Sequence, residues 1–181
     1  MRRPRSLLAF VLAGGLAACA AGAPPIYQPS ETPDAVVRSG DFTLKIASPS
    51  SHWPLDWPIT VTATLSYDGA TPTTVIGAGT GLISFGVREI GGTREMSASF
   101  TSDSVPNDIS PDAPIVDENV KSGGRDTGSD PNTSFYEAFF ADPEFRLPAG
   151  QWEVNAGTRF APEEGGPYSV DMWAGLVLTV E

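Results

Sequence analysis

The sequence contains one cysteine and one histidine in 181 residues, and this scarcity excludes several kinds of site. No disulfide framework can form within the chain, and neither can a zinc site built from Cys and His ligands. His52 is the only candidate base for a Ser-His-Asp triad, and no G-x-S-x-G motif accompanies it. We therefore expect an exposed loop histidine and no catalytic constellation. A pair of hydrolytic carboxylates stays an open alternative, because their separation is set by the tertiary structure.

Basic residues are also few, with 11 Lys and Arg against 22 Asp and Glu. Three of the basic residues and none of the acidic ones lie in the first 18 positions. The remaining 163 residues therefore carry 8 basic and 22 acidic side chains, a formal net charge of −14. A surface with this charge repels nucleic acid. We exclude a nucleic-acid function on this ground.

No apolar run in the sequence is long enough to be a good membrane span by itself. A span needs ~20 predominantly apolar residues, whereas the run from Leu7 to Leu16 has ten and its Ala/Gly continuation ends at Pro24. Arg2, Arg3 and Arg5 precede this run. A short apolar run after basic residues is typical of a secretory signal.

The apolar run ends in Leu16-Ala17-Ala18-Cys19, which resembles the lipobox of bacterial lipoproteins. The resemblance implies that a diacylglycerol is attached to the Cys19 sulfur and that the signal is cut off before this residue. It also implies a protein that is lipid-anchored on the extracytoplasmic face of a cell membrane, or on an outer membrane if the organism has one. An ordinary signal, cut at an Ala-x-Ala site between Ala17 and Ala23, is the alternative.

The chain divides into three predicted parts. Residues 1–18 are the lipoprotein signal peptide, residues 19–40 are the lipidated Cys19 with a flexible tether, and residues 41–181 are one domain. The tether is predicted because four prolines interrupt small and polar residues without any apolar periodicity. We expect no core residue there. A domain of ~140 residues is large enough to bury a stable core without disulfides.

Apolar and polar residues alternate through most of the predicted domain, which indicates β-strands with one buried face. The alternating sets are Phe42, Leu44 and Ile46; Ile59, Val61, Ala63, Leu65 and Tyr67; Ile83, Phe85 and Val87; Met96, Ala98 and Phe100; Trp152, Val154, Ala156 and Phe160; and Met172, Ala174, Leu176, Leu178 and Val180. The last two sets are expected to pair as a hairpin. Residues 73–76 fit a short strand, and residues 135–140 fit a strand or one helical turn. We predict an all-β fold, an antiparallel immunoglobulin-like β-sandwich of about seven or eight strands.

Two resemblances agree with this fold. Residues 147–152, Leu-Pro-Ala-Gly-Gln-Trp, resemble the L-x-x-G-x-Y/W corner before a late strand of immunoglobulin-like and fibronectin-like domains. In those domains the glycine allows a tight corner and the aromatic ring packs into the core, so the resemblance implies a buried Trp152. Residues 59–92, with a Thr-rich strand and a strand before a Gly-Gly turn, are similar to the BsuPI-type bacterial proteinase inhibitors, which are also β-sandwiches.

Residues 102–134 have no clear strand rhythm and carry seven acidic side chains. Loops of this length in compact domains are usually functional or disordered. Asp126, Asp130 and Asn132 lie close to several glycines here, and Asp117 and Glu118 could complete a shell of oxygen ligands. Calcium requires ligands of this kind, so it is the one cofactor that we consider. The alternative is a mobile loop that contacts a partner or nothing.

Two further motifs have competing interpretations. Trp53 and Trp57 predict either an exposed platform for sugar rings or a proline-rich peptide, or a cover over the open end of the sandwich. Gly77, Gly79 and Gly81 are expected in a hairpin or bulge, because a phosphate loop must open a helix and these residues precede a strand.

The expected function is that of a membrane-anchored extracytoplasmic lipoprotein acting as a binding or structural module. Its expected partners are the membrane, through the lipid, and a protein or a peptidoglycan-associated molecule. A protease inhibitor is one alternative, which a rigid and protruding apolar loop would favour. A small hydrolase is the other, which requires a deep pocket with converging carboxylates.

Overall fold

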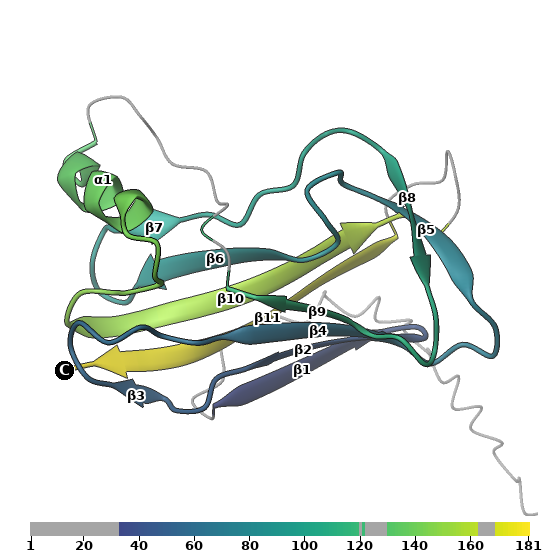
Figure 1. Ribbon diagram of the computed structural model, residues 1–181, viewed down its shortest axis with the longest axis horizontal. Coiled ribbons are helices and arrows are strands. Elements are labelled where there is room, and N and C mark those ends of the chain that lie inside the picture. Colours follow the sequence, from purple (N-terminus) through teal and green to yellow (C-terminus); the bar gives the residue numbers. More distant parts are fainter. Residues whose placement is uncertain (1–32, 120, 122–129, 163–168) are drawn as a thin grey trace, which may run out of the picture.

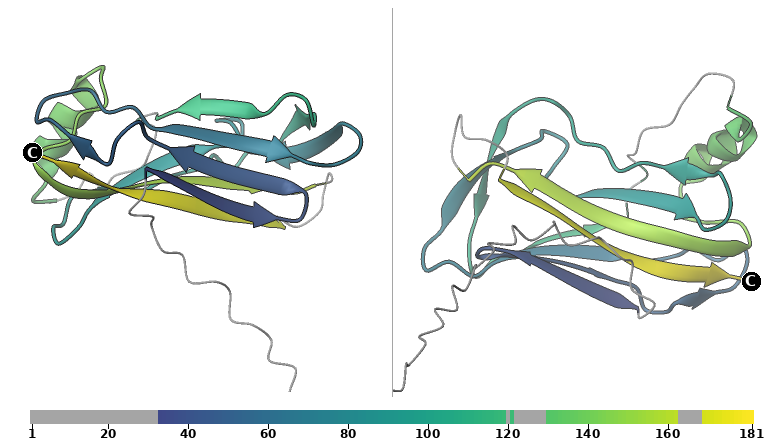
Figure 2. Two further views of the ribbon diagram at one scale, coloured as in Figure 1. Left: turned by 90° about the horizontal axis from the view of Figure 1, so that it is seen from below. Right: turned by 180° about the vertical axis from the view of Figure 1, so that it is seen from behind.

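The computed structural model describes residues 33–119, 121, 130–162 and 169–181 (Figure 1). They form two stacked β-sheets, a separate two-stranded sheet and one helix (Figure 2). In spatial order, the first sheet contains β1 (Asp34–Ser39), β2 (Phe42–Ala47), β4 (Thr62–Tyr67) and β9 (Ile115–Glu118). The second contains β3 (His52–Trp53), β11 (Val170–Val180), β10 (Gly150–Phe160), β6 (Ser84–Glu89) and β7 (Glu95–Met96). The predicted all-β sandwich is therefore confirmed.

The remaining elements lie at the two ends of the sandwich. The two-stranded sheet, β5 (Thr73–Gly77) with β8 (Val105–Ile109), stands at one end, and α1 (Thr133–Ala141) lies beside β7 at the other (Figure 1). None of the helices in the described part of the chain is long and apolar enough to cross a membrane.

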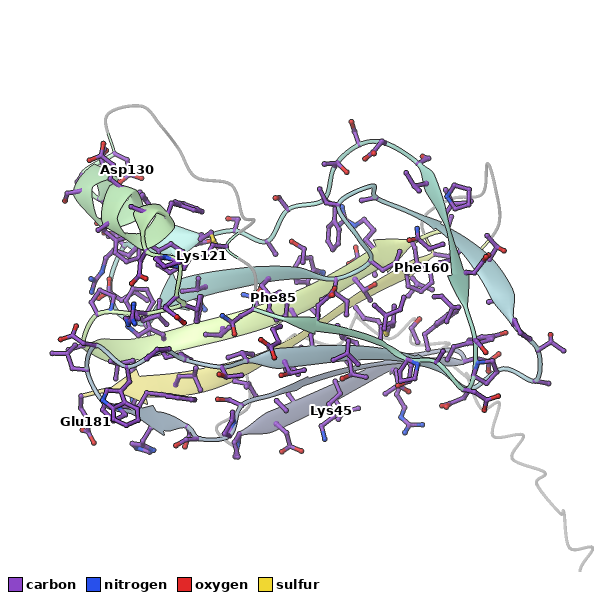
Figure 3. All side chains as sticks on the ribbon, in the orientation of Figure 1. Lys45, Phe85, Lys121, Asp130, Phe160 and Glu181 are labelled. Atoms are coloured by element: carbon purple, nitrogen blue, oxygen red, sulfur yellow. The ribbon has the colours of Figure 1, made fainter. Side chains whose placement is uncertain are left out.

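The core lies between the two main sheets and is built from the alternating residues. The side chains of four residues on facing strands are completely buried: Leu44, Leu65, Val154 and Leu176. Figure 3 shows Phe85 and Phe160 in the space between the layers, with Lys45 on the outside. Burial of these side chains, at about 25 cal/mol per Å² of apolar surface, is the main stabilising term of the fold.

The longest ladder of the second sheet is the predicted hairpin of β10 and β11. The two strands pair antiparallel from Gly150↔Val180 to Phe160↔Val170. The expected turn at residues 163–167 lies outside the described residues. Because both strands are long and largely alternate, their register places the apolar residues of one face in the core.

The corner before β10 has the geometry that its resemblance implies. Gly150 has φ +140°, a conformation that residues with a Cβ rarely adopt. Two residues later Trp152 is completely buried, and its Nε1 donates a hydrogen bond of 2.8 Å to the carbonyl of Pro148. The indole is thus buried with its polar atom satisfied, and Trp152 is confirmed as a core residue.

The predicted tether is too long at its carboxyl end, because β1 begins at Asp34 and pairs along its whole length with β2. Ala35 and Val37 are partly buried against the core, which contradicts the expectation of no core residue before position 41. The sequence does not reveal this strand by alternation of apolar and polar residues, because Val36 is apolar although its position is 53 % exposed. Leu16, Ala17, Ala18 and Cys19 lie outside the described residues, so the lipobox assignment stays a prediction.

The prediction of an irregular segment at residues 102–134 is also wrong in part. It contains β8, β9 and the first residues of α1. Of the two alternatives for residues 135–140, a strand or one helical turn, the structure shows the helix. Pro106 and the polar residues around it conceal β8 in the sequence. A proline is tolerated in this strand because β8 pairs with one strand only, β5. With these additions the described residues contain eleven strands instead of seven or eight, and β3 pairs with β11 in parallel rather than antiparallel.

Two smaller expectations also change. The set from Met96 to Phe100 forms only the two-residue strand β7, which ends at Met96. Gly77, Gly79 and Gly81 do not form a hairpin, since they connect β5 to a strand of a different sheet, β6. The predicted absence of a helix after them is correct, and a turn closes here through a 3.1 Å bond from the Gly81 amide to the Ala78 carbonyl.

Candidate functional site

The strongest candidate site is the segment Trp-Pro-Leu-Asp-Trp-Pro at residues 53–58, which we name the tryptophan loop. It leaves the second sheet after β3 and turns at the end of the sandwich where β11 and the chain end (Figure 1). A 3.2 Å hydrogen bond from the Trp57 amide to the Pro54 carbonyl closes the turn. Asp56 adopts φ +64°, a left-handed conformation that is uncommon for non-glycine residues but more frequent for Asp and Asn than for other types.

Neighbouring segments hold this loop on several sides. The amide of Leu55 donates to the carbonyl of Glu181 at 2.8 Å, and Nε of Arg146 donates to the carbonyl of Asp56 at 2.9 Å. Arg146 is itself oriented by two 2.8 Å hydrogen bonds from its Nη1 to the carboxylate of Asp142. Backbone groups of the loop are thus bound to segments far away in the sequence. The loop is therefore rigid, although it lies on the surface.

The loop exposes two large apolar side chains. Trp57 is 62 % exposed and Leu55 is 47 % exposed, whereas Trp53 is half-buried and packs against the core. The Nε1 of Trp53 donates to the carbonyl of Ser50 at 2.9 Å, which fixes that ring. The two tryptophans therefore do not form the shared platform that their spacing suggested. Trp53 covers the end of the sandwich, and Trp57 projects from it.

His52, next to the loop, has the exposed environment that we expected, although it lies in β3 rather than in a loop. Its Nδ1 lies 3.1 Å from Oγ of Ser51. None of the ion pairs among the described residues involves His52. In the described part of the chain, the ring hydrogen bond of His52 goes to a serine, whereas a triad histidine is oriented by a carboxylate.

The predicted calcium ligands are only partly described by the structure. Asp126 lies outside the described residues. Asp130 accepts a 2.7 Å hydrogen bond from the Asn132 amide, and Nδ2 of Asn132 donates to the carbonyl and Oγ1 of Thr93. Figure 3 shows Asp130 at the outer end of α1. These bonds tie the beginning of α1 to the turn before β7.

The other two acidic candidates, Asp117 and Glu118, belong to β9 in the first sheet. Burial raises the pKa of Asp117, which is a cost of desolvating its charged form. Within the described residues, no group of three or more His, Cys, Asp or Glu side chains could hold a metal ion. The calcium site, which includes Asp126, stays a prediction.

A pocket of about 300 Å³ on the outer face of the second sheet is a further candidate that the sequence analysis missed. Its lining comes from β6, β7, β10, β11 and the residues after β7: Val87, Arg88, Glu95, Met96, Ser97, Ala98, Asn155 and Trp173. Among its described lining residues Glu95 contributes the one carboxylate, whereas glycoside hydrolysis uses a pair. The available signal was Trp173 itself, an aromatic residue at an outward position between Met172 and Ala174.

Comparisons with known proteins do not assign the chain to a family. No protein-family model matches it, and no curated protein is significantly similar to it.

Proposed function

We propose that the protein is a lipid-anchored extracytoplasmic binding module that contacts a protein partner through the tryptophan loop. The observation that carries this proposal is the rigid loop with exposed Leu55 and Trp57. The anchor is supported by the resemblance of residues 16–19 to a lipobox.

Rigidity makes this loop an efficient binding element. A flexible loop loses conformational entropy when it binds, at about 0.5–1.5 kcal/mol for each immobilised side chain, whereas this backbone is already held by Glu181 and Arg146. Tryptophan is enriched among the residues that contribute most to protein interfaces. A total buried area of about 1,000 Å² around Trp57 would therefore be enough for a weak but specific contact.

The attachment point of the tether favours a partner close to the membrane. The amide of Ser48 donates to the carbonyl of Pro33 at 2.8 Å, and Oγ of Ser48 donates to the carbonyl of Thr60 at 3.1 Å, just after the loop. The chain therefore enters the domain near the base of the tryptophan loop. A lipid on Cys19 would keep the loop within the reach of about 14 tether residues, at most ~3.1 Å each in an extended polyproline conformation.

Photocrosslinking on intact cells tests this proposal. A photoreactive amino acid in place of Leu55 is expected to give one discrete crosslinked partner, and adding Trp57→Ala should reduce the product about tenfold. The matched control is the same amino acid in place of Val116, which is 56 % exposed but belongs to β9. Equal products from both positions, or none from position 55, would contradict the proposal.

Protease inhibition is the second candidate function, because the same exposed and rigid loop is what an inhibitor needs to enter a protease cleft. The test is a titration of the purified protein against serine, cysteine and metalloproteases. Stoichiometric inhibition that Trp57→Ala removes would establish this function. A lack of inhibition of all three classes, together with a crosslinked partner that is not a protease, would contradict protease inhibition. The binding module would then be the one remaining candidate function.

A further inference from the structure

The pocket on the outer face of the second sheet has a rigid aromatic wall. Trp173 faces outward from β11 and is paired in register with Gly157 of β10. A Cβ added to Gly157 would lie 2.4 to 2.6 Å from three atoms of the six-membered ring of Trp173, so the indole lies flat against the glycine backbone. No side chain other than that of glycine leaves this space free.

Two further contacts fix the orientation of the indole. Nε1 of Trp173 donates a 2.7 Å hydrogen bond to Oδ1 of Asp171, whose Oδ2 accepts hydrogen bonds of 2.9 and 3.2 Å from Arg159. The ring of Phe100 meets that of Trp173 in an edge-to-face arrangement, with centroids 6.3 Å apart. The wall is thus preorganised, which lowers the entropy that a ligand must offset on binding.

The other side of the pocket offers polar groups. Asn155 lies on β10 at the position opposite Gly86, and its side-chain amide makes no hydrogen bond to any residue that the structure describes. It is half-buried, and with respect to the described residues both its donor and its acceptor are left for a ligand. Glu95 and Ser97 add a carboxylate and a hydroxyl that lie 3.1 Å apart.

The charged side chains that line the pocket, Arg88 and Glu95, have opposite signs, so the pocket has no strong preference for a cation or an anion. The guanidinium of Arg88 pairs with the carboxylate of Glu153, which is 97 % buried and therefore needs this partner. Arg88 would repel a cation, and Glu95 would repel an anion. The pocket volume, about 300 Å³, is at the lower end for small-molecule sites.

We infer that this pocket binds one pyranose ring of a neutral saccharide. The C–H face of a pyranose carries a partial positive charge and fits the negative face of the Trp173 indole. Its hydroxyl groups both donate and accept, as the amide of Asn155 and the carboxylate of Glu95 require. The site is separate from the tryptophan loop, and it does not depend on a lipid anchor.

Isothermal titration calorimetry with the full-length chain purified in detergent tests this inference. The probes are trisaccharides of glucose, xylose, mannose and N-acetylglucosamine, with choline and inorganic phosphate as charged comparisons. At least one trisaccharide is expected to bind saturably at millimolar concentration, and the charged compounds are not. Trp173→Ala should weaken this binding about tenfold or more, the effect of truncating an aromatic anchor.

Two further variants keep the result interpretable. Asn155→Ala removes a side chain without hydrogen bonds to described residues, so the protein should melt like wild type while its affinity falls about fivefold. Trp57→Ala, on the separate tryptophan loop, should leave saccharide binding unchanged. The absence of saturable binding to all four trisaccharides, binding of choline or phosphate alone, or equal affinity of wild type and Asn155→Ala would overturn the inference.

Discussion

Trp152 connects three separate parts of the molecule through one side chain. Its indole hydrogen bonds to the corner at Pro148, stacks with Phe135 of α1 at a centroid distance of 5.9 Å, and lies 4.9 Å from the guanidinium carbon of Arg94. Arg94 in turn donates a hydrogen bond to the carboxylate of Glu89, the last residue of the core strand β6. A single residue thus joins the corner, the helix and the turn before β7.

We predict that Trp152→Ala destabilises the protein by about 3–5 kcal/mol, the usual cost of truncating a buried tryptophan. Urea denaturation followed by circular dichroism measures the change. Trp57→Ala is the matched control, because Trp57 is 62 % exposed and its removal should change stability by less than about 0.5 kcal/mol. Equal unfolding midpoints for Trp152→Ala and wild type would show that this packing does not support the fold.

The ion pair of Glu89 and Arg94 predicts a pH dependence of stability. Hydrogen bonds from Arg94 lower the pKa of Glu89 below its ordinary value of 4.5. The pair therefore stabilises the folded state fully above about pH 4.5, and this contribution is lost as the pH falls through the lower folded pKa. We expect Glu89→Gln and Arg94→Met each to flatten the decline of stability in that acidic range.

The measurement for this pair is the urea midpoint of wild type and both variants from about pH 3 to about pH 7, a range that includes the ordinary pKa of Glu89, 4.5. The three curves should converge toward the acidic end and separate above it. Curves that stay parallel over the whole range would contradict a linked titration of Glu89.

At the scale of elements, α1 depends on a residue from outside the helix. It has no side-chain cap at Asn132, no acidic residue in its first turn and no basic residue in its last. Nζ of Lys121 supplies the missing partner, since it donates to the carbonyls of Phe139 and Asp142 at 2.6 and 2.8 Å and lies 4.4 Å from the centre of the Phe139 ring. Figure 3 shows Lys121 between α1 and the sheets.

Lys121→Met should loosen the end of α1, because it keeps most of the side-chain volume and removes both hydrogen bonds to the last carbonyls. The expected loss of stability is about 1–2 kcal/mol, accompanied by faster amide hydrogen exchange in residues 136–142. Lys45→Met is the control, since the Lys45–Asp34 pair is half-exposed with 4.0 Å between its charged atoms and such pairs contribute little. Unchanged exchange rates in α1 would refute the capping role.

Elements with strict local alternation were predictable from the sequence, and those that depend on distant partners were not. β10 and β11 alternate over eleven residues each, so their pairing follows from the pattern. β9 has four residues and forms only because β4 offers a free edge to it. α1 is short and aromatic, and its helical state depends on contacts with Trp152 and Lys121 that the local sequence does not contain.

The candidate sites divide in the same way. The tryptophan loop was visible in the sequence as two tryptophans that are each followed by a proline. Its rigidity comes from Arg146 and Glu181, which are far away in the chain. The saccharide pocket requires the register that places Trp173 beside Gly157 and Asn155 beside Gly86. Period-two alternation predicts which residues face outward, but not which outward residues become neighbours.

The whole molecule has two surfaces for contacts with different chemistry. The tryptophan loop presents apolar side chains at the end of the sandwich, near the point where the chain from residue 33 enters. The outer face of the second sheet presents a rigid indole and polar groups. The residues after the predicted signal carry a formal net charge of −14. A domain with this charge is repelled by anionic surfaces. We therefore propose that the lipid on Cys19, rather than the domain surface, holds the protein at the membrane.

The intact mass of the protein purified from the membrane fraction tests this proposal most directly. We predict a mature chain that begins at Cys19 and carries a diacylglycerol on its sulfur. Its two or more acyl chains would anchor the protein stably, because each buried methylene contributes about 0.8 kcal/mol. Cys19→Ala should then be unprocessed or released from the membrane. A wild-type chain that begins at another residue and carries no lipid, or a Cys19→Ala variant that is cleaved normally and stays equally membrane-bound, would contradict it.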